Sequence, residues 1–137
     1  MIVDTSVLLA AFVPNQRMHS KCANLIRNTN RLVISPFVLA ELDYLTAQIA
    51  GVQAELVLLN ELCSGAYELA EFKINDLTQA TEIVDRYSDL PIGLTDASLI
   101  VLASRYSTNV IATLDERHFR VARSLEGQPF RVLPADG

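Results

Sequence analysis

The sequence predicts an α/β domain in three layers, with helices on both faces of a central, mostly parallel sheet. Short apolar runs that suit buried strands alternate with longer segments in which apolar residues have helical spacing. Parallel strands joined by right-handed crossovers are the usual outcome of that alternation. The chain has 137 residues, and 50% of them are hydrophobic, which is enough for a substantial core. We therefore expect one domain over residues 1–137, without linkers or internal repeats.

The chain begins with a predicted strand and two short helices. The strand is MIVD at residues 1–4, where three apolar residues lead into an aspartate. The first helix is TSVLLAAF at 5–12, which must end before Pro14 because proline cannot continue a helix. A second short helix is predicted over 19–28.

A second strand and a long helical region follow. RLVIS at 31–35 has the composition of a buried strand, and the Ser35-Pro36 pair then opens a helix, with proline in the first turn. That helix is predicted to extend to Gly51. A further helix at 53–63 carries leucine on one face and ends near Gly65.

The second half of the chain repeats the alternation. Residues 66–72 form a candidate strand, and a helix is predicted over 75–89. A largely apolar helix at 95–107 leads into a strand at 109–115, and the last strand is expected at 130–134. In such sheets ligands bind at the carboxyl ends of the strands.

The charge is uneven along the chain. The formal net charge of −5 argues against nucleic-acid binding, but the stretch from Thr5 to Ala40 contains no acid. That stretch and the end of the chain hold most of the basic residues: Arg17, Lys21, Arg27, Arg31, Arg105, Arg117, Arg120, Arg123 and Arg131. Arginine suits bidentate phosphate contacts. An ordinary mixed surface explains the same pattern equally well.

The remaining composition points to a cytoplasmic protein. No apolar run reaches the length of a membrane span, and the start lacks the basic segment of a secretory signal. Cys22 and Cys63 have no metal-ligand spacing, and we expect both to be free, buried thiols. His19 and His118 are predicted to lie at the surface or at helix ends.

Four acidic residues are the candidates for a functional site. Asp4 and Asp115 each follow an apolar strand, so they would emerge at the same edge of a parallel sheet. Asp96 begins a helix that points to that edge. Glu41 lies beside the apolar stripe of its helix, too far from the helix start to be a cap.

Each acid also has a purely structural explanation. Asp4 and Asp115 could cap the helix or turn that follows them, Asp96 could interact with the helix dipole, and Glu41 could pair with an arginine. All four meeting in one place would instead create mutual repulsion that a divalent cation relieves. Oxygen ligands favour Mg²⁺ or Mn²⁺. Four neighbouring hydroxyls could orient a carboxylate or a water molecule: Thr5, Ser6, Thr95 and Thr113.

Four segments together resemble the PIN-domain ribonucleases, and among them the VapC-type toxins of bacterial toxin–antitoxin pairs: MIVDTSVLLA, SPFVLAELDYL, GLTDASLIVLASRY and VIATLDERHF. The resemblance covers nearly the whole chain. It implies a PIN-like fold in which Asp4, Glu41, Asp96 and Asp115 bind Mg²⁺ or Mn²⁺. It also implies a metal-dependent endoribonuclease that cleaves structured RNA, tRNA or rRNA, and inhibits translation.

The resemblance further implies partners. A homodimer is expected, together with a cognate VapB-type antitoxin that blocks the site and supplies binding to operator DNA. The leucine-rich region around Gly51 is our candidate for an antitoxin groove. Arg117, Arg120, Arg123 and the acid-free stretch before Glu41 are our candidates for contacts to RNA phosphates.

Two other functions remain open at this point. A phosphotransfer or phosphatase domain could use Asp4 as a nucleophile, but such domains need a lysine near late strand ends, and the only lysines are Lys21 and Lys73. A non-catalytic PIN-like binding module is the second alternative. The presence of all four acids favours an active enzyme.

Overall fold

The structure, a computed structural model that describes residues 1–137, contains five short parallel strands in the order β3-β2-β1-β4-β5. Their bounds are Ile2–Val3 for β1, Leu32–Ile34 for β2, Tyr67–Leu69 for β3, Val110–Ala112 for β4 and Arg131–Leu133 for β5. Ile2 pairs with both Val33 and Ile111, so β1 is the central strand. The predicted parallel sheet is therefore confirmed, and every strand pair in it is parallel.

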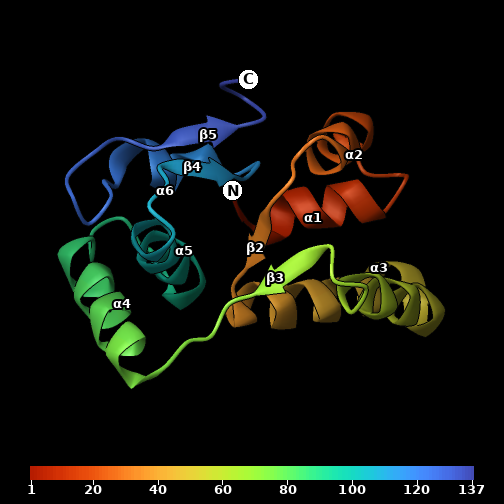
Figure 1. The fold of residues 1–137 in the computed structure, drawn as a ribbon, viewed down its shortest axis with the longest axis horizontal. Coiled ribbons are helices and arrows are strands. Elements are labelled where there is room, and N and C mark those ends of the chain that lie inside the picture. Colours follow the sequence, from red (N-terminus) through yellow and green to blue (C-terminus); the bar gives the residue numbers. More distant parts are fainter.

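Six helices connect and cover the strands: α1 (Thr5–Phe12), α2 (His19–Arg27), α3 (Pro36–Leu62), α4 (Ile74–Arg86), α5 (Leu94–Arg105) and α6 (Glu116–Val121). Helix α1 packs against α2 and α3, whereas α4 packs against α5. Figure 1 shows these two groups on opposite sides of the strands, which makes the three predicted layers. None of the helices combines the length and apolar character needed to span a bilayer.

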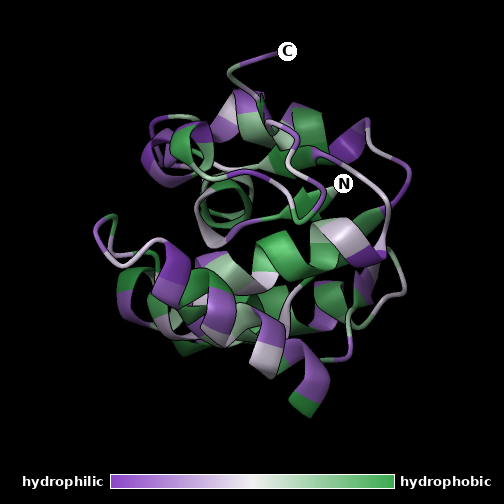
Figure 2. Ribbon diagram, turned by 90° about the vertical axis from the view of Figure 1, so that its left-hand side faces the viewer, coloured by the Kyte–Doolittle hydropathy of each residue, from purple (hydrophilic) through white to green (hydrophobic).

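The core is built from the strands and from the inner faces of α1 and α5. Ile2, Val3 and Ile111 are fully buried, as are Leu8 of α1 and Leu99 of α5. In Figure 2 green, hydrophobic segments lie mainly in the centre of the molecule, and green alternates with purple along the outer helices. This burial fixes the strand ends, and with them the side chains that follow β1 and β4.

Helix α3 begins as predicted, since the Ser35 hydroxyl caps it by accepting a hydrogen bond from the Phe37 N–H at 3.1 Å. The two helices predicted on either side of Gly51 form one element with a kink at that glycine, which has a φ of 88°. A positive φ is easily adopted only by glycine, so the residue fixes the bend.

Several sequence expectations need correction. Cys22 is buried as expected, but Cys63 is exposed. The apolar region around Gly51 is partly exposed, as expected of a candidate groove, with Ile49 47% and Val52 60% exposed. Residues 116–121, for which no helix was predicted, make helix α6. A six-residue segment rich in charge has too little apolar periodicity to be predicted.

Candidate metal centre

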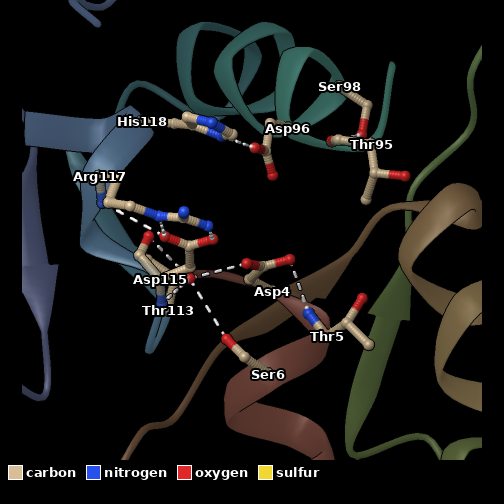
Figure 3. Close-up of polar contacts among 10 residues, drawn as sticks. All are labelled: Asp4, Thr5, Ser6, Thr95, Asp96, Ser98, Thr113, Asp115, Arg117 and His118. Atoms are coloured by element: carbon tan, nitrogen blue, oxygen red, sulfur yellow. Dashed lines mark hydrogen bonds and ion pairs between the residues drawn. The ribbon is translucent and has the colours of Figure 1, made fainter. Parts of the chain in front are cut away.

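Asp4 lies at the end of the central strand β1, and its carboxylate is held from two sides. Its backbone N–H extends the ladder by donating to the Ala112 carbonyl at 2.8 Å. Oδ1 accepts from the Thr5 N–H at 2.8 Å, and Oδ2 accepts from the Thr113 hydroxyl at 2.7 Å (Figure 3). The side chain is thus fixed by β4 and by the start of α1, and only 7% of the residue is exposed.

Thr113 links the ends of β1 and β4. Its hydroxyl oxygen accepts from the Asp115 N–H at 3.1 Å while its proton goes to Asp4. The Ser6 hydroxyl lies 3.3 Å from it and also accepts from the Leu114 N–H at 2.9 Å. These contacts give two of the four hydroxyls named from the sequence a positioning role.

The environment of Asp4 disfavours its negative charge. Burial, followed by the nearby charges of Asp96 and Glu41, raises its pKa to about 6, against the opposing effect of the hydrogen bonds from Thr113 and Thr5. A buried carboxylate facing two other acids is an arrangement that a cation would stabilise.

Asp96 is in the first turn of α5, and it contacts a residue that the sequence reasoning placed elsewhere. His118 Nδ1 lies 2.5 Å from Asp96 Oδ2, and both side chains are mostly buried. The other oxygen of Asp96 points toward Asp4 in Figure 3. His118 does lie in the last turn of its helix, α6, as expected, but the sequence reasoning missed its contact with one of the four acids.

Asp115 precedes α6 and is paired with an arginine from the same helix. Arg117 donates Nε to Oδ1 at 3.0 Å and Nη2 to Oδ2 at 2.9 Å. Hydrogen bonding to Arg117 is the main reason that the pKa of Asp115 is lowered. Both carboxylate oxygens accept from Arg117, so this arginine competes with any cation for the charge of Asp115.

Glu41 is exposed on the second turn of α3 and takes part in no ion pair. Its sequence alternative, pairing with an arginine, is therefore wrong. It reaches the mouth of the pocket that Asp4 closes at the bottom, beside the apolar side chains of Leu9 and Leu45.

The structure brings all four acids to one pocket, which Thr5, Ser6 and Thr95 also line. The acids do not form a preassembled site, since no group of three or more Asp, Glu, His or Cys side chains lies at metal-binding spacing. The donor set nevertheless fits a hard cation. The polar side chains that line the pocket are all carboxylates and hydroxyls, and neither sulfur nor imidazole lines it.

Two of the acids also have the helix-capping role that was the structural alternative for them. Asp4 caps α1 through the Thr5 N–H, and Asp115 caps α6 through the Arg117 N–H. Capping accounts for one oxygen of each carboxylate. It does not account for the burial of the Asp4 carboxylate next to two further acids. That burial lowers the stability of the fold, as is typical of residues kept for function.

The fold and the pocket define a class: a parallel α/β domain with an acidic pocket at the carboxyl edge of its central strands. A family model described as PIN domain matches residues 1–124. The chain is 47% identical to Ribonuclease VapC26 of Mycobacterium tuberculosis over 135 residues, which are 98% of this chain and 100% of that protein. The chain belongs to the PIN-domain family and, within it, to the VapC proteins.

Solved structures show the same fold. The structure of VapC20 from Mycobacterium tuberculosis, described as a sarcin–ricin loop cleaving toxin, superposes with a TM-score of 0.75 at 19% identity, over 80% of this chain and 85% of that one. VapBC2 from Rickettsia felis, bound to a DNA fragment from its promoter, gives a TM-score of 0.68 at 18% identity, with 96% of each chain covered.

Proposed function

We propose that this chain is a toxin that cleaves RNA by metal-dependent hydrolysis, with Asp4, Glu41, Asp96 and Asp115 holding Mg²⁺ or Mn²⁺. The single observation that carries the proposal is the meeting of these four acids in one pocket at the end of β1 and β4. Near-full-length identity of 47% to a protein named as a ribonuclease supports the reaction.

The bound cation would activate the attacking water and stabilise the departing oxygen of the phosphodiester. The chain's own residues prepare the pocket for that chemistry. Thr113 and the Thr5 N–H hold Asp4, and His118 holds Asp96 with one oxygen left free toward the pocket. Fixed ligands lose little conformational freedom when a cation binds, which favours binding.

Arg117 is placed to change partners during the reaction. In the structure its guanidinium neutralises Asp115 at the edge of the pocket, and 80% of the side chain is exposed. A cation bound by Asp115 would release Arg117 toward the solvent side, where a phosphate of the RNA backbone would approach. Guanidinium groups bind phosphate oxygens with the same two-pronged geometry that they use for carboxylates.

The expected substrate is structured RNA, either tRNA or rRNA, and the expected regulator is a VapB-type antitoxin that also carries operator-DNA binding. VapBC2 from Rickettsia felis, a fold relative, is described on a fragment of promoter DNA. The exposed apolar side chains of α3 around Gly51 favour this region as the antitoxin surface, with the chain itself as a homodimer: Tyr44, Ile49, Val52, Leu56 and Val57.

The phosphotransfer alternative gains no support, because neither lysine of the chain lines the acidic pocket. A cleavage assay distinguishes an enzyme from a non-catalytic binding module. Purified chain is incubated with RNA in the presence of Mn²⁺ or Mg²⁺, and again with EDTA. We expect cleavage that EDTA abolishes.

A matched pair of variants makes the test specific to the pocket. Glu41→Gln removes a charge from the pocket, whereas Glu82→Gln makes the same change on an exposed face of α4. We expect Glu41→Gln and Asp4→Asn to lose cleavage and growth inhibition, and Glu82→Gln to retain both. Cleavage by all three variants would place the active site outside this pocket, whereas no cleavage by the wild-type chain would favour the binding-module interpretation.

A further inference from the structure

A second cleft lies beside the acidic pocket, and it is basic. Arg17, Met18 and Lys21, from the α1–α2 connection and the start of α2, form one wall. The opposite wall consists of Thr113, Leu114 and Glu116, with Pro134 near the C-terminus. Figure 1 shows α2 and the C-terminal segment on the same side of the molecule, next to β4 and β5.

Only one layer of residues separates this cleft from the acidic pocket. Thr113 lines the basic cleft and at the same time donates its hydroxyl proton to Asp4 at 2.7 Å. Leu114, the next residue of the wall, donates its N–H to Ser6 of the acidic pocket at 2.9 Å. A chain of phosphates with one member in the acidic pocket would therefore continue directly into the basic cleft.

The cleft has uncompensated positive charge. Arg17 and Lys21 are exposed and take part in no ion pair. The acids on the opposite side, Glu116 and Asp136, share a single arginine, Arg120, at 2.6 and 2.8 Å, which offsets part of their charge. Arg120 is therefore occupied, contrary to the idea that it is free for phosphate, and the two cations across the cleft are left to act on a ligand.

The segment that carries these cations is well defined. His19 contacts the Ala10 carbonyl through Nδ1 at 2.8 Å, which ties the start of α2 to α1. The His19 N–H also donates to the Gln16 carbonyl at 3.1 Å, closing the turn that includes Arg17. Met18 between the cations packs against the core. An ordered backbone reduces the entropy that this segment would otherwise lose on binding a ligand.

We propose that Arg17 and Lys21 form a phosphate-binding subsite for the RNA backbone, adjoining the acidic pocket across Thr113. This inference rests on the proposed ribonuclease function and names the part of the chain that holds the substrate. It also explains how a chain with a net charge of −5 holds a polyanion: the binding charge is local, and Arg120 offsets part of the charge of Glu116 and Asp136.

The test compares two double variants that remove the same charge. Arg17→Gln with Lys21→Gln empties the cleft, and Arg86→Gln with Arg131→Gln removes two exposed arginines that do not line it. Binding of a fluorescent single-stranded RNA is measured by anisotropy over a range of salt concentrations, in EDTA so that the RNA stays intact. Thermal unfolding shows whether each variant is folded.

The logarithm of the association constant falls with the logarithm of the salt concentration, and loss of two phosphate contacts should make that slope shallower by about 1.4. Each contact to a single strand contributes about 0.7 to the slope. At about 0.1 M salt this difference in slope corresponds to roughly 25-fold weaker binding than that of the wild type. In cleavage assays with Mn²⁺ we expect a higher KM and an unchanged kcat. The control double variant should keep the wild-type slope, affinity and kinetics.

Equal slopes and affinities for the two double variants would overturn the subsite. A loss restricted to single- or double-stranded DNA, with RNA binding unchanged, would also overturn it and assign the cleft to DNA. Failure of the proposed function looks different: wild-type chain would leave RNA intact in Mn²⁺ whatever the state of the cleft. A wild-type chain that does not bind RNA at all would overturn both.

Discussion

The replacement Asp4→Asn should stabilise the metal-free protein at neutral pH, although it removes a residue that we place at the centre of the site. The pKa of Asp4 rises from 3.8 to about 6 through burial and the neighbouring charges of Asp96 and Glu41. Its carboxylate therefore destabilises the folded state when it is ionised. Asparagine has nearly the same shape and carries no charge.

The shift corresponds to about 3 kcal/mol of unfolding free energy, since the group is almost completely buried. Asparagine has only one acceptor oxygen. It can keep the bond from the Thr5 N–H but must face the Thr113 hydroxyl with an amide group, at a cost of about 1 kcal/mol. The net gain is about 2 kcal/mol, or roughly 4–8 °C in Tm.

The sign of the effect depends on pH. Below pH 3.8 the Asp4 carboxyl is protonated in both the folded and the unfolded chain, so it carries no penalty. As pH rises from 3.8 to about 6, the unfolded chain ionises first and the folded state loses relative stability. The advantage of asparagine is thus complete above about pH 6 and absent at acid pH, where the lost hydrogen bond makes the variant the less stable protein.

The assay is thermal unfolding of both proteins in EDTA across this pH range. Asp85→Asn, a matched change of an exposed acid on α4, serves as the control and should shift the unfolding free energy by less than about 0.5 kcal/mol at any pH. Equal melting temperatures of wild type and Asp4→Asn at neutral pH, or a difference that does not vary with pH, would refute the reasoning that the buried charge of Asp4 destabilises the folded protein.

Three further outcomes follow from individual contacts. His118→Ala should weaken Mn²⁺ binding about 10- to 100-fold in calorimetry, because Asp96 loses the partner that orients it, while Tm changes little. Arg117→Ala should strengthen Mn²⁺ binding in the same experiment, since Asp115 no longer has to exchange an arginine for the cation; weaker binding would contradict its role as a competitor. Ser35→Ala should lower the unfolding free energy by about 1–3 kcal/mol in urea, because α3 loses its cap and the buried Ser98 hydroxyl, 2.8 Å away, keeps only its bond to the Thr95 carbonyl; an unchanged midpoint would contradict this role of Ser35.

The local signals in the sequence were sufficient for much of the fold. The helix at 5–12 has the predicted bounds because a capping aspartate precedes it and a proline follows it. Ser35-Pro36 marked the start of α3 equally well. Helix α6 was missed because its six residues carry no apolar period, and its only buried side chain is Phe119.

In the site, too, the features set by neighbouring residues were predictable from the sequence, and those set by distant residues were not. Acids at strand ends are predictable from parallel topology, and Asp4, Asp96 and Asp115 do line one pocket. The partners of those acids are not predictable, because they depend on side-chain directions. His118 lies 22 residues from Asp96 in the chain, and only its spacing of three from Asp115 hinted at the same helix face.

The sequence also could not predict which apolar side chains of α3 face the core and which face solvent. Periodicity identifies an apolar face, but it cannot tell whether that face meets the core or solvent. Leu58 is buried at 2% exposure, whereas Val57 beside it is 69% exposed. The kink at Gly51 changes which residues face inward, and such a rotation has no signature in a hydropathy pattern.

The central claim is that these carboxylates bind one or two hard cations together, and anomalous diffraction from crystals grown with Mn²⁺ tests it most directly. We predict manganese between the end of β1 and the start of α5, with oxygens of Asp4 and Asp96 at about 2.1 Å and Arg117 turned away from Asp115. Manganese bound elsewhere, or an acidic pocket that stays empty at saturating Mn²⁺ while the protein still degrades RNA, would contradict it.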